Sequence, residues 1–117
     1  AARLRPPAPA PADGAELHGV PEIIDTGTLM LHGALVHLNG VAGETGDPVR
    51  DLVRYIRGRQ VDCAAVAAGQ YRCKIENFDL GEAIVLNGAG RAAPDAPPRL
   101  RSAEEKARQA QRGIWRQ

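Results

Sequence analysis

Two cysteines are the side chains whose spacing in this sequence most directly implies a chemistry. Cys63 and Cys73 have nine residues between them and lie in β-like runs that are separated by a turn. Two thiols at this spacing, with no histidine nearby, lack the ligand set of a tetrahedral metal site. The pair is either two buried free thiols or a disulfide between antiparallel strands, and we favour the disulfide. It would add up to about 3 kcal/mol of stability and would indicate an oxidising compartment.

A basic helix face is the second group with chemical potential. Asp47 is expected to cap a helix that ends at Gly58, with Pro48 at its first position, where the missing N–H costs nothing. Apolar residues at i, i+3, i+4 and i+7 predict one buried stripe, formed by Val49, Leu52, Val53 and Ile56. The opposite face carries Arg50, Arg54 and Arg57. Such a face can hold phosphates, but solvation is its commoner use, and we expect a solvated face.

The composition argues against nucleic acid as a ligand. Aromatic residues make up 3% of the chain, whereas binding of single strands by base stacking needs several exposed rings. The formal net charge is +1, so no strong field attracts a polyanion or an anionic membrane. Apolar residues make up 44%, and no apolar run approaches the roughly 18 to 20 residues of a membrane span. We expect a soluble domain that binds no nucleic acid and does not span a membrane.

The chain divides into an arm and a domain. Residues 1–17 hold four of the nine prolines. Proline fixes φ and cannot donate a hydrogen bond to a sheet, so this segment is expected to be a flexible, Pro/Ala-rich N-terminal arm. It is either a solvated linker or a peptide arm that docks along a partner in polyproline II form. Residues 18–117 are expected to form the domain.

The elements of the domain follow from turn and capping signals. Three strands at 21–25, 28–31 and 34–38 are joined by turns, most of which contain glycine, and a further pair at 60–63 and 71–75 holds the cysteines. Asp79 and Glu82 have capping-box spacing at the start of a second helix, which ends at Asn87 and Gly88. Ser102 and Glu105 predict a capping box for the last helix. The order predicts an α+β fold, a five-stranded OB-type β-barrel with three helices.

Two C-terminal segments carry a family resemblance. Residues 79–92 read DLGEAIVLNGAGRA, and residues 103–115 read AEEKARQAQRGIW. A "DL-x-x-x-LV-x-x-G-x-A" helix followed by an "AE-x-x-A-R-x-x-x-x-G-L/I-W" helix resembles the closing part of staphylococcal-nuclease-like (thermonuclease) proteins. The pair Cys63 and Cys73 is similar to the cysteine pair of many exported bacterial members. The resemblance covers about 19–117; it implies the same barrel with three helices and a periplasmic or otherwise exported location.

The first catalytic motif of that family is altered in this chain. In active members two carboxylates hold calcium, a glutamate acts as general base on water, and two arginines stabilise the transition state. The family's "D-G-D-T" turn corresponds to Asp25-Thr26-Gly27-Thr28. The resemblance therefore implies that the metal-ligand position falls on Gly27, while Asp25 matches the family's first aspartate, which is not the principal ligand.

The second catalytic motif is altered as well. The family's "V-R-L-x-G-I-D-A-P-E" strand corresponds to residues 36–45, which read VHLNGVAGET. The resemblance then places the first arginine at His37, the second metal carboxylate at Ala42 and the general base at Thr45, with Glu44 one place early. The last arginine falls near Ala68. The resemblance thus leaves a vestigial cleft of Asp25, Gly27, Thr28, His37, Ala42, Glu44 and Thr45.

These losses predict a protein that is not an enzyme and that has no catalytic residues, metal or cofactor. We expect a structural or accessory interaction protein, a subunit of a larger periplasmic or membrane-associated assembly, with the arm as a candidate contact. One alternative is a calcium-dependent nuclease with a displaced active site that uses Asp25, His37, Glu44 and Arg72. Another is an OB domain that binds oligosaccharide or nucleic acid, which the fold favours but the few aromatics and the net charge do not.

Overall fold

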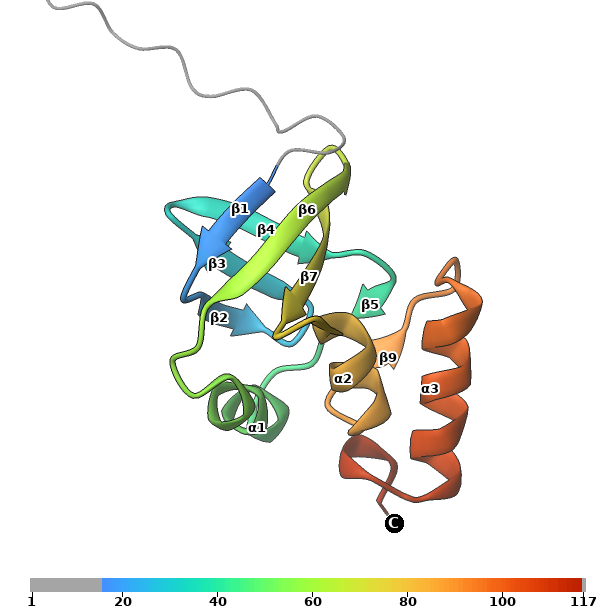
Figure 1. The fold of residues 1–117 in the computed structure, drawn as a ribbon. Coiled ribbons are helices and arrows are strands. Elements are labelled where there is room, and N and C mark those ends of the chain that lie inside the picture. The colour runs from blue at the N-terminus through green and yellow to red at the C-terminus, as the bar shows by residue number, and fades with distance from the viewer. Residues whose placement is uncertain (1–15, 117) are drawn as a thin grey trace, which may run out of the picture.

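A computed structural model describes residues 16–116, which form an α+β protein (Figure 1). The strands are β1 (Glu16–Gly19), β2 (Glu22–Asp25), β3 (Thr28–Leu31), β4 (Ala34–Leu38), β5 (Val41–Ala42), β6 (Val61–Ala67), β7 (Gln70–Ile75), β8 (Phe78–Asp79) and β9 (Arg91–Ala92). The helices are α1 (Asp47–Ile56), α2 (Leu80–Leu86) and α3 (Pro98–Gln109), and a 3-10 turn, η1 (Gly113–Trp115), follows. The three predicted helices are present, whereas the expectation of five strands omitted several short ones.

Most strands belong to one twisted sheet. Its order is β1-β6-β7-β4-β3-β2, with β8 beside β7, while β5 and β9 form a separate pair. The ladders of this sheet are antiparallel except that between β4 and β7, where His37 and Leu38 lie beside Gln70 and Tyr71. The sheet is not closed into a barrel. The two edge strands of the sheet, β1 and β2, follow each other in the chain and are separated by Val20 and Pro21. Pro21 has no N–H to donate to a ladder, so strand pairing does not continue through it.

The first strand lies partly inside the predicted arm. Glu16 and Leu17 pair with Ala64 and Cys63 of β6, so the domain begins at least two residues earlier than expected. His18, the next residue, places its Nδ1 2.7 Å from Oδ1 of Asp62. The hydrogen bond to Asp62 raises the pKa of His18. The remainder of the predicted arm, residues 1–15, lies outside the described residues.

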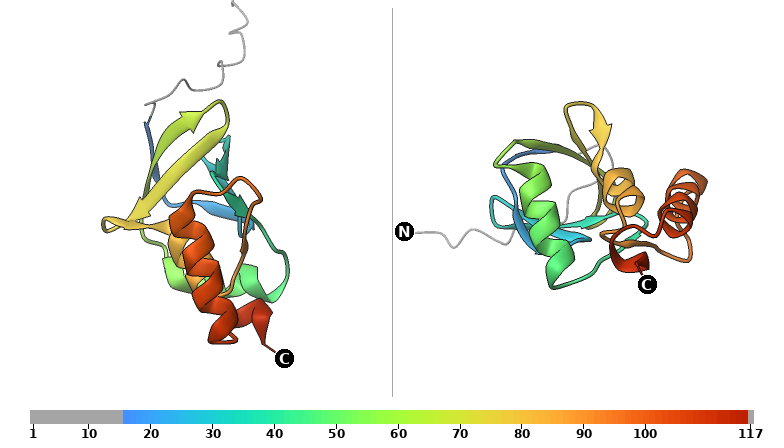
Figure 2. Two further views of the ribbon diagram at one scale, coloured as in Figure 1. Left: turned by 90° about the vertical axis from the view of Figure 1, so that its right-hand side faces the viewer. Right: turned by 90° about the horizontal axis from the view of Figure 1, so that it is seen from below.

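The core lies between the curved sheet and the helices α1 and α2. Alternate residues of β7 point inward, as expected for a strand with one solvated face. Figures 1 and 2 show α2 between the sheet and α3. A second apolar cluster fills the space between these two helices and consists of Val85, Ala96, Leu100 and Ala103. The small side chains of α3, buried at Ala103 and Ala107, let the two helices approach closely.

The predicted disulfide is confirmed. Cys63 of β6 and Cys73 of β7 are direct partners in the antiparallel ladder, and their sulfur atoms are bonded. Both residues are buried, at 1% and 0% exposure. The interpretation as two free thiols is therefore wrong, because the register of the hairpin places the two side chains on the same face and directly opposite each other.

The helix starts differ from the expectation in two of three cases. Asp79 caps α2 as predicted, since its Oδ2 accepts a hydrogen bond of 2.8 Å from the N–H of Glu82. The N-cap of α1 is Gly46, not Asp47, because the backbone there has φ +78°, which glycine adopts without strain. The predicted Ser102 capping box of α3 is wrong. Pro98 starts that helix earlier, with the φ that a first turn requires.

One buried side chain in this core gives a direct test of the packing. Tyr71 is 1% exposed, and its hydroxyl has no hydrogen-bond partner within the described residues. A buried hydroxyl without a partner costs about 1–3 kcal/mol. We expect Tyr71→Phe to leave the free energy of unfolding unchanged or to raise it by about 1 kcal/mol in urea denaturation. The partly exposed Tyr55 provides the control, Tyr55→Phe. A clear loss of stability in Tyr71→Phe alone would contradict the expectation.

Candidate functional site

The region predicted as a vestigial cleft is built from the β2–β3 turn and the loop that follows β5. The turn is held by Asp25, whose Oδ1 accepts a hydrogen bond of 2.7 Å from the N–H of Gly27. The loop pairs with the same turn through Thr26, which is 0% exposed. The N–H of Thr26 donates to the carbonyl oxygen of Glu44 at 3.0 Å, and the N–H of Glu44 donates to Oγ1 of Thr26 at 2.7 Å. These bonds hold the loop directly on the turn.

Two glycines, Gly27 and Gly43, face each other where the turn meets the loop. A Cβ atom on Gly27 would lie 3.0 Å from the backbone nitrogen of Gly43. A Cβ atom on Gly43 would lie 2.5 Å from the nitrogen of Gly27 and would collide with Oδ1 of Asp25. Real Cβ atoms almost never approach other atoms below 3.0 Å. A side chain at position 43 would therefore collide with the turn, and one at position 27 would fit only if the loop backbone moved by a few tenths of an ångström.

A cavity of about 510 Å³ opens beside this contact. Of the seven predicted cleft residues, Asp25, Gly27, Thr28 and His37 line it. Ala42, Glu44 and Thr45 do not line it, although Glu44 is bonded to the turn through its backbone. The sequence reasoning missed Asp95 and Gln70, which line the same cavity from the α3-proximal connection and from β7. Neither residue carries a motif signal, because each reaches the cavity through the tertiary fold.

Two of the polar side chains around the cavity contact each other. Thr28 and His37 are direct partners between β3 and β4, and Oγ1 of Thr28 lies 3.3 Å from Nδ1 of His37. The carboxylate of Glu44 pairs instead with Arg91 of β9, at 3.4 Å between Oε2 and Nε. Within residues 16–116 no group of three or more His, Cys, Asp and Glu side chains is placed to hold a metal ion.

Two of the four residues of the displaced nuclease constellation line this cavity. Asp25 and His37 line the cavity, but Glu44 and Arg72 do not. Arg72 lies on the outer face of β7 and lines a different, much smaller depression near Asp79. The position predicted for the last arginine, Ala68, lies in the exposed β6–β7 turn. No arginine is among the residues that line the 510 Å³ cavity.

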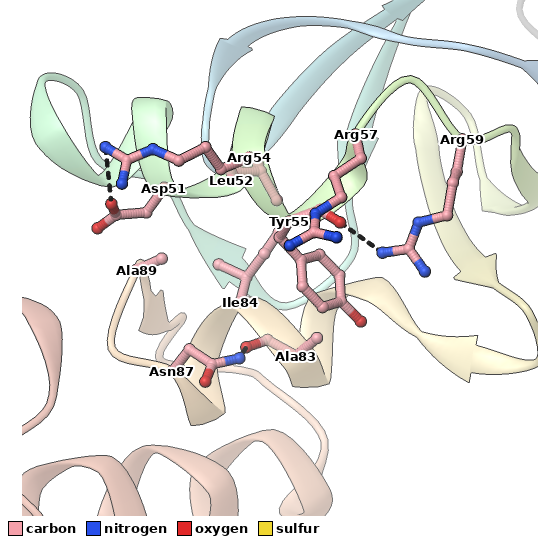
Figure 3. Close-up of a pocket in the computed structure, with 10 residues that line it drawn as sticks. All are labelled: Asp51, Leu52, Arg54, Tyr55, Arg57, Arg59, Ala83, Ile84, Asn87 and Ala89. Carbon is pink, nitrogen blue, oxygen red and sulfur yellow. Dashed lines mark hydrogen bonds and ion pairs between the residues drawn. The ribbon is translucent and has the colours of Figure 1, made fainter.

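A larger cavity, of about 660 Å³, lies between α1 and α2 (Figure 3). Its lining residues are Asp51, Leu52, Arg54, Tyr55, Arg57, Arg59, Ala83, Ile84, Asn87 and Ala89. The sequence reasoning treated the arginines of α1 as a solvated face. These arginines are exposed, as expected, and Arg54 and Arg57 also line the groove, whereas Arg50 lies outside it. The tyrosine between them, Tyr55, is the sequence signal that could have marked this side of the helix.

The chain was compared with family models and with curated proteins. No family model matches the chain, and no curated protein matches it. Within the described residues, no helix is both long and apolar enough to cross a membrane.

Proposed function

We propose that the chain is a non-catalytic, thermonuclease-like OB-type domain that acts as a structural or accessory interaction protein. The OB-type arrangement is supported by the two ends of the sheet. β1 and β2 are separated by two residues in the chain, and β1 also contacts β3. A hydrogen bond of 2.7 Å joins the ring of His32, in the β3–β4 turn, to the carbonyl oxygen of His18 in β1. With β1 and β2 counted as one bent strand, the main strands form a five-stranded, partly open barrel.

The observation that carries the loss of catalysis is the backbone contact between Gly27 and Gly43. The resemblance assigns a calcium carboxylate to position 27, and calcium needs several oxygen ligands at about 2.3–2.6 Å. Position 27 has no side chain to supply such an oxygen, and the backbone of Gly43 packs tightly against it. The arrangement therefore supports a turn and loop that serve to stabilise the fold.

The carboxylates that remain nearby have structural partners. Asp25 accepts a hydrogen bond from the turn it belongs to, and Glu44 pairs with Arg91. Each of these contacts orients the carboxylate toward a neighbouring part of the protein. Both contacts support a structural role for these side chains, and with it a domain that acts through its surface.

The disulfide supports a periplasmic or otherwise exported location, because such bonds persist in oxidising compartments and are rare in the cytosol. In that compartment we propose a subunit of a larger periplasmic or membrane-associated assembly. The Pro/Ala-rich residues 1–15 remain a candidate contact for the partner, since such a segment loses little entropy when it binds in extended form.

The test of this function begins with nuclease activity. We expect no calcium-dependent cleavage of denatured DNA above the level of a His37→Ala variant, with an active thermonuclease as positive control. The variant is suitable because His37 is exposed and its contact with Thr28 is on the surface. Calcium-dependent cleavage that falls in His37→Ala would contradict the proposal and support the displaced active site.

The interaction half of the proposal is tested in the same preparation. The full chain and a chain that starts at Glu16, which keeps β1 intact, are used as baits on native periplasmic and membrane fractions. We expect a stoichiometric partner that co-purifies with the full chain. A strictly monomeric protein that retains no partner in either form would argue against an interaction role.

A further inference from the structure

The groove between α1 and α2 combines an aliphatic floor with a cationic rim. The floor is made of Leu52 from α1 together with Ala83, Ile84 and Ala89 from α2 and its C-terminal end, all of which are at most 8% exposed. Figure 3 shows the ring of Tyr55 extending from α1 toward Ala83 of α2, and Arg57, which follows α1, pointing to the same side. The volume of about 660 Å³ lies within the range of about 300–1,000 Å³ that is typical of ligand sites.

The charge of the rim is positive. Three guanidinium groups, of Arg54, Arg57 and Arg59, line the groove, against one carboxylate, that of Asp51. Asp51 lies 3.8 Å from Arg54, a long and exposed contact that contributes little. Among the described residues, the Arg57 guanidinium has no ion pair. The rim therefore offers cationic donors whose natural complement is a carboxylate, which a guanidinium can bind through two hydrogen bonds.

The neighbouring arginine is held in place before any ligand arrives. Nε of Arg59 donates to the carbonyl oxygen of Ile56 at 3.0 Å, and a second nitrogen of the same group donates to the carbonyl oxygen of Tyr55. Its guanidinium also lies 5.2 Å from the centre of the Tyr55 ring and 3.2 Å from Oε2 of Glu76. These contacts fix one wall of the groove, so ordering that wall on binding costs little entropy.

We propose that this groove binds a short acidic segment of a partner protein, which inserts a bulky apolar side chain between α1 and α2. Carboxylates that flank this side chain contact Arg54 and Arg57. The inference rests on the proposed function as an interaction protein and names its docking surface. It also assigns a role to Arg57, whose position at the end of α1 is fixed by a hydrogen bond of 3.0 Å from its N–H to the carbonyl oxygen of Val53.

The observations favour an acidic peptide over other occupants. The floor is aliphatic, and the single ring of the groove, Tyr55, already carries Arg59, so little is available for stacking a base. The net charge of +1 gives no long-range attraction for a polyanion. The N-terminal residues 1–15 of the chain carry Arg3 and Arg5 against a single carboxylate, Asp13, so their charge does not complement the rim.

A peptide-display selection tests the proposal without requiring an identified partner. The full-length, oxidised protein is immobilised and selected against random peptides. We expect a consensus in which acidic residues flank a bulky apolar residue. The same selection is run on a double variant, Arg54→Glu with Arg57→Glu, and on the matched control Arg50→Glu. Arg50 lies on the same helix but outside the groove, and it contacts Asp47 at 3.4 Å.

Affinity measurements complete the test. A fluorescent peptide with the selected consensus is expected to bind the wild type and Arg50→Glu equally, and to bind the double variant roughly tenfold more weakly or worse. The mutated side chains are exposed, so all three proteins should melt at the same temperature. Equal binding by the double variant, a basic consensus, or no consensus would overturn the proposal. Displacement of the peptide by a thymidine oligonucleotide would also overturn it, in favour of nucleic acid.

This result is separable from the test of the proposed function. If a native partner co-purifies with the protein but still binds the Arg54→Glu, Arg57→Glu variant, the interaction role stands and the groove is not its docking surface. If calcium-dependent cleavage is found, the non-catalytic function fails, whatever the groove binds.

Discussion

Gly88→Ala is expected to lower the free energy of unfolding by about 3 kcal/mol, a large loss for the addition of one methyl group. Gly88 follows α2 with φ +74°, a left-handed conformation that costs an L-residue roughly 1–2 kcal/mol. A Cβ atom there would lie 2.6 Å from the carbonyl carbon of Arg112 and would collide with its oxygen. Because the colliding atoms belong to the backbone, the C-terminal segment must move to make room for the new methyl group, which costs about 1–3 kcal/mol more.

The control for this substitution is Gly58→Ala. Gly58 follows α1 with φ +71°, and no atom lies within 4 Å of its Cβ position, so only the conformational cost of about 1 kcal/mol applies. Urea denaturation gives both values. The C-terminal segment also carries the one tryptophan, Trp115, whose ring lies 4.5 Å from the guanidinium carbon of Arg108. We expect the fluorescence of Trp115 to change in Gly88→Ala but not in Gly58→Ala. Equal losses of stability in the two variants would show that the backbone contact is unimportant.

Removal of the disulfide is expected to have the next largest effect. The double variant Cys63→Ala, Cys73→Ala should lose about 3 kcal/mol, because the bond closes a loop with a sequence separation of 10 residues and so restricts the unfolded chain. The measurement is the midpoint of urea denaturation for the oxidised wild type, the reduced wild type and the double variant.

The reduced wild type separates the cross-link from the packing of the sulfur atoms. Both cysteines are buried, so alanine also leaves a small cavity, whereas reduction leaves the volume nearly unchanged. We expect reduction alone to account for most of the loss, and we expect the reductant to have no effect on the double variant. A reduced protein as stable as the oxidised one would mean that the hairpin is equally restricted without the bond.

The sequence predicts well those elements whose signals are local. The strands on either side of the Thr26-Gly27 and His32-Gly33 turns lie within one residue of the prediction, because a glycine in a two-residue turn marks both strand ends. Asp79 and Glu82 likewise defined the start of α2. In α3 the capping pattern at Ser102 predicted the wrong helix start. The sequence alone does not distinguish such a pattern in the middle of a helix from one at its start.

The sites depend on contacts between remote segments and were predicted only in part. The motif comparison located Asp25, Gly27, Thr28 and His37, which do line one cavity. It could not show that Gly43 would pack against the turn, because that contact depends on how the loop after β5 folds back. The groove between α1 and α2 was missed for the same reason. Helical periodicity predicted a buried Val53, but this residue is 52% exposed, because α1 packs through a narrower face.

The order of strands in the sheet also determines when the chain can fold. β6 and β7 form a hairpin across a short turn, so their pairing involves little loop closure and can precede the rest. β1 and β4 both precede this hairpin in the chain yet pair with its two strands, β1 with β6 and β4 with β7. Pairing over such separations is slow, since the entropy of the intervening loop is lost before the contact forms. The pairing of β1 and β4 with this hairpin must therefore wait until the chain has been made as far as residue 75, whereas β2, β3 and β4 can pair with one another earlier through their short turns.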